Sequence, residues 1–125
     1  MWSARKVFNK RAQGEVFEQL ALSYLKQQGL TFISQNVNFK GGEIDLIMSD
    51  DTRLVFVEVR YRKNRQFGGA AASVGTQKQQ RLVKAAQLYL QKHYGNSPPS
   101  CRFDVVAIEG DEPDYQINWL KNAIS

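Results

Sequence analysis

The residues best suited to chemistry are two acids that lie inside apolar stretches. Asp45 lies in Gly-Glu-Ile-Asp-Leu-Ile (42–47), and Glu58 lies in Leu-Val-Phe-Val-Glu-Val (54–59). A hairpin that turns after Asp51 would set Asp45 opposite Glu58. Directly opposed side chains point to one face of a sheet, with Cβ atoms about 5 Å apart. The sequence therefore predicts a close pair of carboxylates.

Two like charges this close destabilise a fold unless something offsets them. A shared proton, an intervening Lys or Arg, or a bound cation would each do so. A hard divalent ion suits the pair, because Mg²⁺ commonly takes one or two carboxylates together with waters and phosphate oxygens. We therefore expect Mg²⁺ or Mn²⁺ on Asp45 and Glu58, with the carbonyl of Val59 as a further ligand. The alternative is that one acid pairs with a basic neighbour while the other reaches solvent.

Three further side chains can converge on this pair. Lys78 falls on the inward stripe of a helix predicted over 76–94, where its amine either enters the site or snorkels to solvent. Glu18 lies at the edge of the apolar stripe of the first helix. Glu43 comes opposite Arg60 in the same register, which favours an ordinary cross-strand ion pair over a catalytic role for Glu43.

Basic residues follow the second acid. The candidate nucleic-acid-binding residues are Arg60, Arg62, Lys63 and Arg65, together with Lys78 and Arg81 of the next helix. Such charges hold a phosphodiester backbone and carry no sequence information. The alternative is a solvated basic loop within residues 60–75.

The elements that must position these groups follow the order α-β-β-β-α-β, with a further edge strand near the end. The pattern predicts a helix from Gln13 that stops at Gly29, strands over 31–39, 44–48, 54–59, 102–108 and 115–120, and a helix over 76–94 with Thr76 as N-cap. The continuously apolar 54–59 should be a central strand, covered on both faces. Residues 54–108 read as a parallel βαβ unit, so we expect an α/β fold with a mixed sheet flanked by helices.

Length and composition limit the remaining possibilities. The chain has 125 residues, 42% hydrophobic and 23% charged, so we expect one domain over 1–125 with a flexible arm over 1–12. The sequence has no apolar run of membrane-spanning length, no signal-peptide core and only one cysteine, so we expect a cytoplasmic protein that touches no membrane. The net charge of +5 suggests a polyanionic partner.

These stretches resemble the YraN family of bacterial proteins and, more broadly, the PD-(D/E)XK nuclease superfamily. The resemblance covers residues 18–106 and rests on Glu18 with Ala21, on 42–47, on 55–60, on Lys78 with Arg81 and Leu82, and on 102–106. Its most specific part is Gly-Glu-Ile-Asp-Leu-Ile paired with Val-Glu-Val. It implies a restriction-endonuclease-like core. Asp104, in the last matched stretch, is expected to make a structural pairing.

The resemblance implies roles residue by residue. The superfamily's metal-binding Asp falls on Asp45, its Glu on Glu58 and its helix acid on Glu18. Its lysine position falls on Arg60, which departs from the pattern because an arginine cannot give up its proton to act as a base. Lys78 could supply the missing amine.

The implied activity is metal-assisted hydrolysis of phosphodiester bonds in DNA, on branched or repair intermediates, by a monomer or a homodimer. Arg60 gives weight to a second function, a nucleic-acid-binding module that keeps the acid pair but has lost turnover. A third function is a protein-interaction domain whose charge is incidental.

The acid pair itself leads to a stability prediction. In metal-free buffer, Glu58→Gln should raise the melting temperature by about 3–5 °C, because the amide removes like-charge repulsion. Differential scanning calorimetry in the presence of a chelator measures this. A clear loss of stability would argue against the facing-acid geometry.

Overall fold

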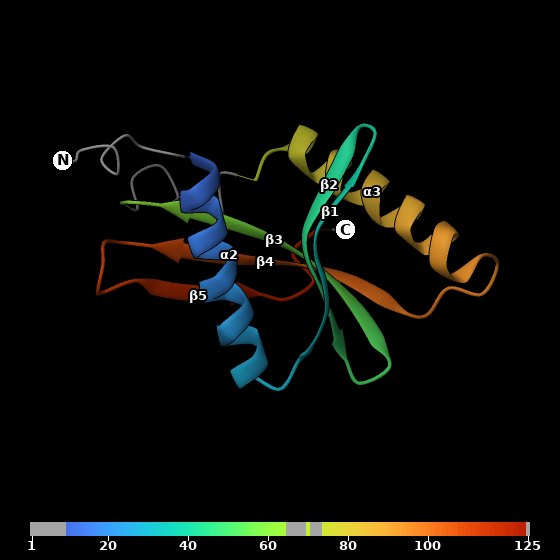
Figure 1. The fold of residues 1–125 in the computed structure, drawn as a ribbon, viewed down its shortest axis with the longest axis horizontal. Coiled ribbons are helices and arrows are strands. Elements are labelled where there is room, and N and C mark those ends of the chain that lie inside the picture. Colours follow the sequence, from blue (N-terminus) through green and yellow to red (C-terminus); the bar gives the residue numbers. More distant parts are fainter. Residues whose placement is uncertain (1–9, 65–69, 71–73, 125) are drawn as a thin grey trace.

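The computed structural model describes residues 10–64, 70 and 74–124, which form a mixed sheet of five strands with one helix on each face (Figure 1). The elements are α2 (Lys10–Gln27), β1 (Thr31–Phe39), β2 (Gly42–Asp50), β3 (Arg53–Arg62), α3 (Thr76–Tyr94), β4 (Cys101–Glu109) and β5 (Gln116–Leu120). The strands lie side by side in sequence order. Only β3 and β4 are parallel among the neighbouring pairs of these strands. This confirms the predicted α/β fold with a mixed sheet.

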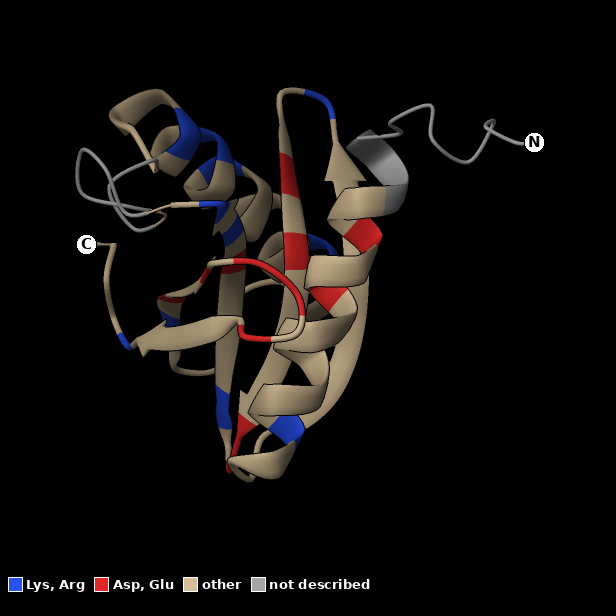
Figure 2. Cartoon of the chain, turned by 90° about the vertical axis from the view of Figure 1, so that its left-hand side faces the viewer, with Lys and Arg blue, Asp and Glu red and all other residues tan. Residues whose placement is uncertain are grey.

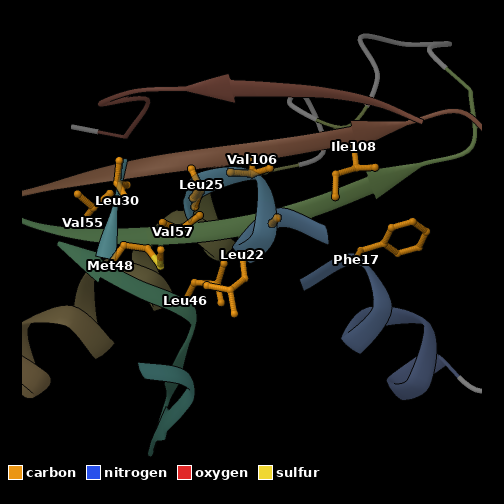
Figure 3. Packing of buried hydrophobic residues seen from close by; sticks show 11 residues of the cluster. Phe17, Leu22, Leu25, Leu30, Leu46, Met48, Val55, Val57, Val106 and Ile108 are labelled. Atoms are coloured by element: carbon orange, nitrogen blue, oxygen red, sulfur yellow. The ribbon is translucent and has the colours of Figure 1, made fainter. Parts of the chain in front are cut away.

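Each helix buries its apolar stripe against one face of the sheet. The α2 side holds Phe17, Ala21, Leu22, Leu25, Leu30, Leu46, Met48, Val55, Val57, Val106 and Ile108 (Figure 3). The α3 side holds Ile44, Ile47, Leu54, Phe56, Val74, Leu82, Ala85, Ala86, Tyr89, Val105 and Ile124. Neighbouring residues of β3 alternate between the two clusters, as side chains of a strand must. The central, doubly covered position predicted for 54–59 is thus confirmed.

The helix boundaries differ from prediction at their starts. Helix α2 begins at Lys10, so the last three residues of the predicted arm are helical, while residues 1–9 lie outside the described part. The N-cap of α3 is Gly75 rather than Thr76, because the extended Gly75 already accepts the first helical bond from the Gln79 N–H. Within the described residues, neither helix is long and apolar enough to cross a membrane.

Strand β3 also runs further than predicted. Its parallel ladder with β4 continues to the pair Arg62↔Glu109, so Arg60 and Arg62 belong to the strand and not to the loop. The backbone of the strand therefore fixes the positions of both arginines.

Asp104, near the start of β4, is fully buried. Its carboxylate accepts hydrogen bonds from Arg102 Nε at 3.0 Å, Trp119 Nε1 at 2.9 Å and the Asn122 N–H at 2.8 Å. Buried charges are tolerated when they are paired and hydrogen-bonded in this way. The predicted structural pairing of Asp104 is confirmed.

Gly42 allows α3 to lie directly on β2. A Cβ at this position would overlap the carbonyl oxygen of Arg81 and would come 3.2 Å from the Ala85 Cβ. Any side chain larger than hydrogen would therefore push the N-terminal half of α3 away from the sheet. Lys78 lies in that half, so Gly42 also sets where the lysine stands.

Gly42→Ala should lower the free energy of unfolding by about 1–3 kcal/mol, because overpacking forces the helix to shift. Gly14 is the matched control, since it lies within α2 with no atom close to the added methyl group. Gly14→Ala should therefore be neutral or stabilising by about 0.5–1 kcal/mol. Urea denaturation of both variants tests the contact, and equal effects would contradict it.

Candidate functional site

The sheet divides between β2 and β3 at the end of their ladder. The observed pairs run from Asp50↔Arg53 to Leu46↔Val57, which is the register predicted from the sequence. Beyond them, Ile44 packs on the α3 side of the sheet, whereas Val59 packs on the α2 side. The predicted continuation of this ladder, with Asp45 opposite Glu58, Ile44 opposite Val59 and Glu43 opposite Arg60, is therefore wrong.

An irregularity in both β1 and β2 lies beside this division. The pairs Gln35↔Leu46 and Val37↔Ile44 enclose Asn36 and Asp45. Asn36 has a φ of 52°, in the left-handed region that Asn tolerates better than most residues. Ile44 and Ile47 share one face although they are three residues apart, so the alternation of side chains is broken at Asp45. Irregularities of this kind redirect a side chain out of the regular pattern.

Asp45 reaches across the resulting gap to β3. Its Oδ2 accepts a hydrogen bond from the Val59 N–H at 2.9 Å. The N–H and C=O of one strand residue point to the same side, so the Val59 carbonyl also faces this gap. The structure thus brings the carboxylate of Asp45 to the backbone of Val59, the two residues that the sequence analysis grouped with Glu58 as ligands.

Glu58 is buried in the same region, with only 2% of its surface exposed. Two cations approach its Oε2: Lys78 Nζ at 3.6 Å and Arg60 Nη1 at 3.8 Å. Lys78 comes from the first turn of α3, as its place on the inward stripe predicted. The buried carboxylate of Glu58 therefore lies beside two basic side chains.

Burial raises the pKa of Glu58 to about 8, and the nearby charge of Asp45 adds to the effect while Lys78 and Arg60 oppose it. Burial also raises the pKa of Asp45, against the hydrogen bond from Val59. The two acids therefore interact electrostatically, as the sequence predicted, although they do not face each other in one continuous ladder. Besides a proton and a neighbouring Lys or Arg, a bound cation can also relieve the repulsion between two such carboxylates.

Glu18 enters the site from the opposite face of the sheet. It is half-buried on α2, and burial together with the charge of Asp45 raises its pKa to about 7, while a side-chain hydrogen bond with Asn36 opposes the shift. The divided sheet lets α2 and α3, which lie on opposite faces, contribute to one place.

These groups line one open cleft of about 1120 Å³. Its lining comprises Gln13, Gly14, Glu15, Phe17, Glu18, Asn36, Asn38, Glu43, Asp45, Glu58, Val59, Arg60, Tyr61, Arg62 and Lys78. Figure 2 shows acidic positions on α2 and β2 beside each other, and basic positions gathered on α3. Within the cleft lining, acids come from α2, β2 and β3, whereas the basic residues are Arg60 and Arg62 of β3 and Lys78 of α3, which we call its basic wall.

Two of the other predicted nucleic-acid-binding residues lie apart from this lining. Lys63 and Arg81 are exposed and do not line the cleft, and Arg65 lies outside the described residues. Of the five predicted residues that the structure describes, Arg60, Arg62 and Lys78 line the cleft beside the acid pair.

Sequence reasoning missed Asn36 and Asn38. Both line the cleft, and the Asn38 side chain donates to the Asn36 carbonyl at 3.2 Å. The available signal was two asparagines in a stretch otherwise suited to a strand, since Asn is disfavoured there and enriched at irregular positions.

The donor set fits a hard cation. Two carboxylates and a carbonyl oxygen are within the usual requirement of Mg²⁺ and Mn²⁺, which complete their shell with waters. Within residues 10–64, 70 and 74–124, no group of three or more His, Cys, Asp or Glu side chains is arranged to hold a metal. Two side chains, Asp45 and Glu58, are thus the candidate anchors.

Comparison with known proteins gives a consistent result. Residues 17–108 match the model of the uncharacterised protein family UPF0102. A UPF0102 protein of Janthinobacterium sp. (strain Marseille) is 55% identical over 115 residues, which cover 92% of this chain and 89% of the relative. A UPF0102 protein of Coxiella burnetii is 53% identical over 107 residues, covering 86% and 87%. The matched range includes every acid of the cleft except Glu15.

The raised pKa values predict how metal-free stability depends on pH. Folded Glu58 and Glu18 keep protons that the unfolded chain releases above its ordinary pKa of 4.5. The folded state therefore holds more protons, and stability falls as the pH rises from about 5 to about 8. We expect a loss on the order of 1 kcal/mol or more, measured by urea denaturation with a chelator.

Glu58→Gln provides the control, because its amide does not titrate. The decrease between the two pH values should be smaller in this variant than in the wild type. An identical decrease would show that the protons are held elsewhere.

Proposed function

The chain belongs to the uncharacterised protein family UPF0102, and we propose that it is a Mg²⁺- or Mn²⁺-dependent nuclease that hydrolyses phosphodiester bonds in DNA. The observation that carries this proposal is the cleft in which Asp45 and buried Glu58 meet Lys78 and Arg60. Carboxylates bind a divalent cation, and the cationic side chains of Lys and Arg bind a phosphate. Metal-assisted phosphodiester hydrolysis uses both kinds of group at one site. The resemblance of the same residues to the PD-(D/E)XK superfamily supports this reading.

In this proposal the acids of the divided sheet hold the ion. Asp45 and Glu58 would bind it, with the Val59 carbonyl as a further oxygen donor. A bound ion of this kind lowers the pKa of a coordinated water and polarises a phosphate oxygen. The hydrogen bond from Val59 N–H to Asp45 fixes the orientation of that carboxylate beforehand.

The basic wall has a separate task. Lys78 and Arg60 stand beside Glu58, where they would contact phosphate oxygens and offset the negative charge that grows during attack. Arg62 continues the same strand towards the cleft edge and would hold the adjoining backbone. Because arginine cannot act as a base at working pH, proton transfer within the chain would fall to Lys78 or Glu18.

Branched or repair-type DNA is our proposed substrate, and cytoplasmic location is part of the same proposal. The second candidate is a nucleic-acid-binding module without turnover. Its supporting observation is that arginine stands at position 60, and that both nearby cations already approach one oxygen of Glu58. In that case the protein would bind DNA with a steep salt dependence and would not cut it.

Cleavage of a labelled panel of linear, flapped and junction DNA with Mn²⁺ tests the proposal. The wild type should cut at least one substrate, and Asp45→Asn should reduce the rate by about 10²-fold or more, because it removes an ion-binding charge. Asp51→Asn is the matched control: it is the same change in the exposed turn at the other end of β2, at a φ of 63° that Asn accepts.

The outcomes separate the two candidates. Cutting that survives Asp45→Asn unchanged indicates a contaminating nuclease. DNA binding without cutting by the wild type supports the second candidate, and absence of both overturns the first and the second.

A further inference from the structure

Glu58 has two positively charged neighbours, and they approach the same atom. Lys78 Nζ lies 3.6 Å and Arg60 Nη1 lies 3.8 Å from its Oε2. The Glu58 side chain is 3% exposed, so these two cations supply much of the charge that makes its ionised form tolerable in the interior. In the metal-free protein they occupy the role that a divalent cation would otherwise fill.

A permanent ion pair in this protein has a different geometry. Arg102 Nε lies 3.0 Å from Asp104 Oδ1, and the two side chains are 9% and 0% exposed. The Asp104 carboxylate also has donors from Trp119 and Asn122. The Lys78–Glu58 contact is longer, and the lysine side chain is 35% exposed at the cleft. The contrast indicates a contact that can be exchanged.

Lys78 is better suited to exchange than Arg60. Its ammonium is a compact, strongly hydrated charge on a flexible stem, whereas the arginine fork is planar and stiff. Lys78 also projects from the first turn of α3 into the cleft, so water and ligand can reach its amine. Arg60 projects from β3, whose backbone is fixed by its ladder with β4.

We propose that Lys78 is an exchangeable internal counter-cation, which offsets the ionised acid pair in the metal-free protein and leaves Glu58 when a divalent cation binds. The released amine then stands next to the bound ion, where a phosphate oxygen would arrive. This inference rests on the proposed function and concerns how that function is regulated. Binding of the metal ion and release of the Lys78 amine from Glu58 occur together. It predicts that Lys78 opposes metal binding while it assists phosphate binding.

Titration with Mn²⁺, read by calorimetry and by the free-Mn²⁺ resonance signal, tests the exchange. Lys78→Met keeps an unbranched stem but removes the charge. We expect its dissociation constant for Mn²⁺ to fall by about tenfold, because the ion no longer competes with a neighbouring positive charge. Without metal at about pH 8, the same variant should melt below the wild type, since the acid pair has lost a counter-charge.

Lys84→Met is the matched control. Lys84 lies on the same helix, exposed, with its amine against the β1–β2 turn at Gly41. Its removal should leave both the Mn²⁺ affinity and the metal-free melting temperature near those of the wild type. This comparison separates a local effect at Glu58 from a general change in net charge.

The results distinguish the exchange from the nuclease proposal. Tighter Mn²⁺ binding by Lys78→Met supports the exchange even if no DNA is cut, in which case the nuclease proposal alone fails. Unchanged or weaker binding by Lys78→Met, with a wild type that binds Mn²⁺ through Asp45, overturns the exchange alone. A wild type that takes up no Mn²⁺ overturns both.

Discussion

The burial of two carboxylates next to each other is the constraint on which the rest of this site depends. Glu58 is almost wholly removed from water, and Asp45 adds a like charge beside it. Such a pair costs free energy unless cations or donors offset it. The molecule supplies the Val59 N–H to Asp45, and Lys78 with Arg60 to Glu58. The same lysine and arginine are the groups that a phosphate would contact in the proposed reaction, so the residues that stabilise the acid pair are also those proposed for the chemistry.

The second requirement is access, and the divided sheet provides it. In a continuous sheet, α2 and α3 would be separated by a full layer of strands. The β2–β3 ladder ends at Leu46↔Val57, next to left-handed Asn36 and the broken alternation at Asp45. Residues from both helices line one cleft. Gly42 completes the arrangement by letting α3 rest on β2 without an intervening side chain.

Much of this could be predicted from the sequence, because apolar alternation fixes which residues face the core. The register from Asp50↔Arg53 to Leu46↔Val57, the acid pair and the inward position of Lys78 all follow from that pattern. The break at Asp45 does not follow from the apolar pattern, because that pattern does not report a left-handed residue such as Asn36 on the partner strand. The strand position of Arg62 depends on a tertiary partner, because β3 extends as far as β4 accompanies it. The ion, the nucleic acid and the activity remain proposals, for they depend on ligands rather than on the fold.

The arrival of the two helices from opposite faces also has a consequence for how the protein folds. Glu18 comes from α2 and Lys78 from α3, while Asp45 and Glu58 come from the strands between them. A nascent chain with only its N-terminal half collapsed would hold the acids without the lysine, and no segment shorter than the entire α-β-β-β-α unit contains all four groups. The cleft is therefore complete only when both helices have docked on the sheet, and a partly folded molecule lacks it.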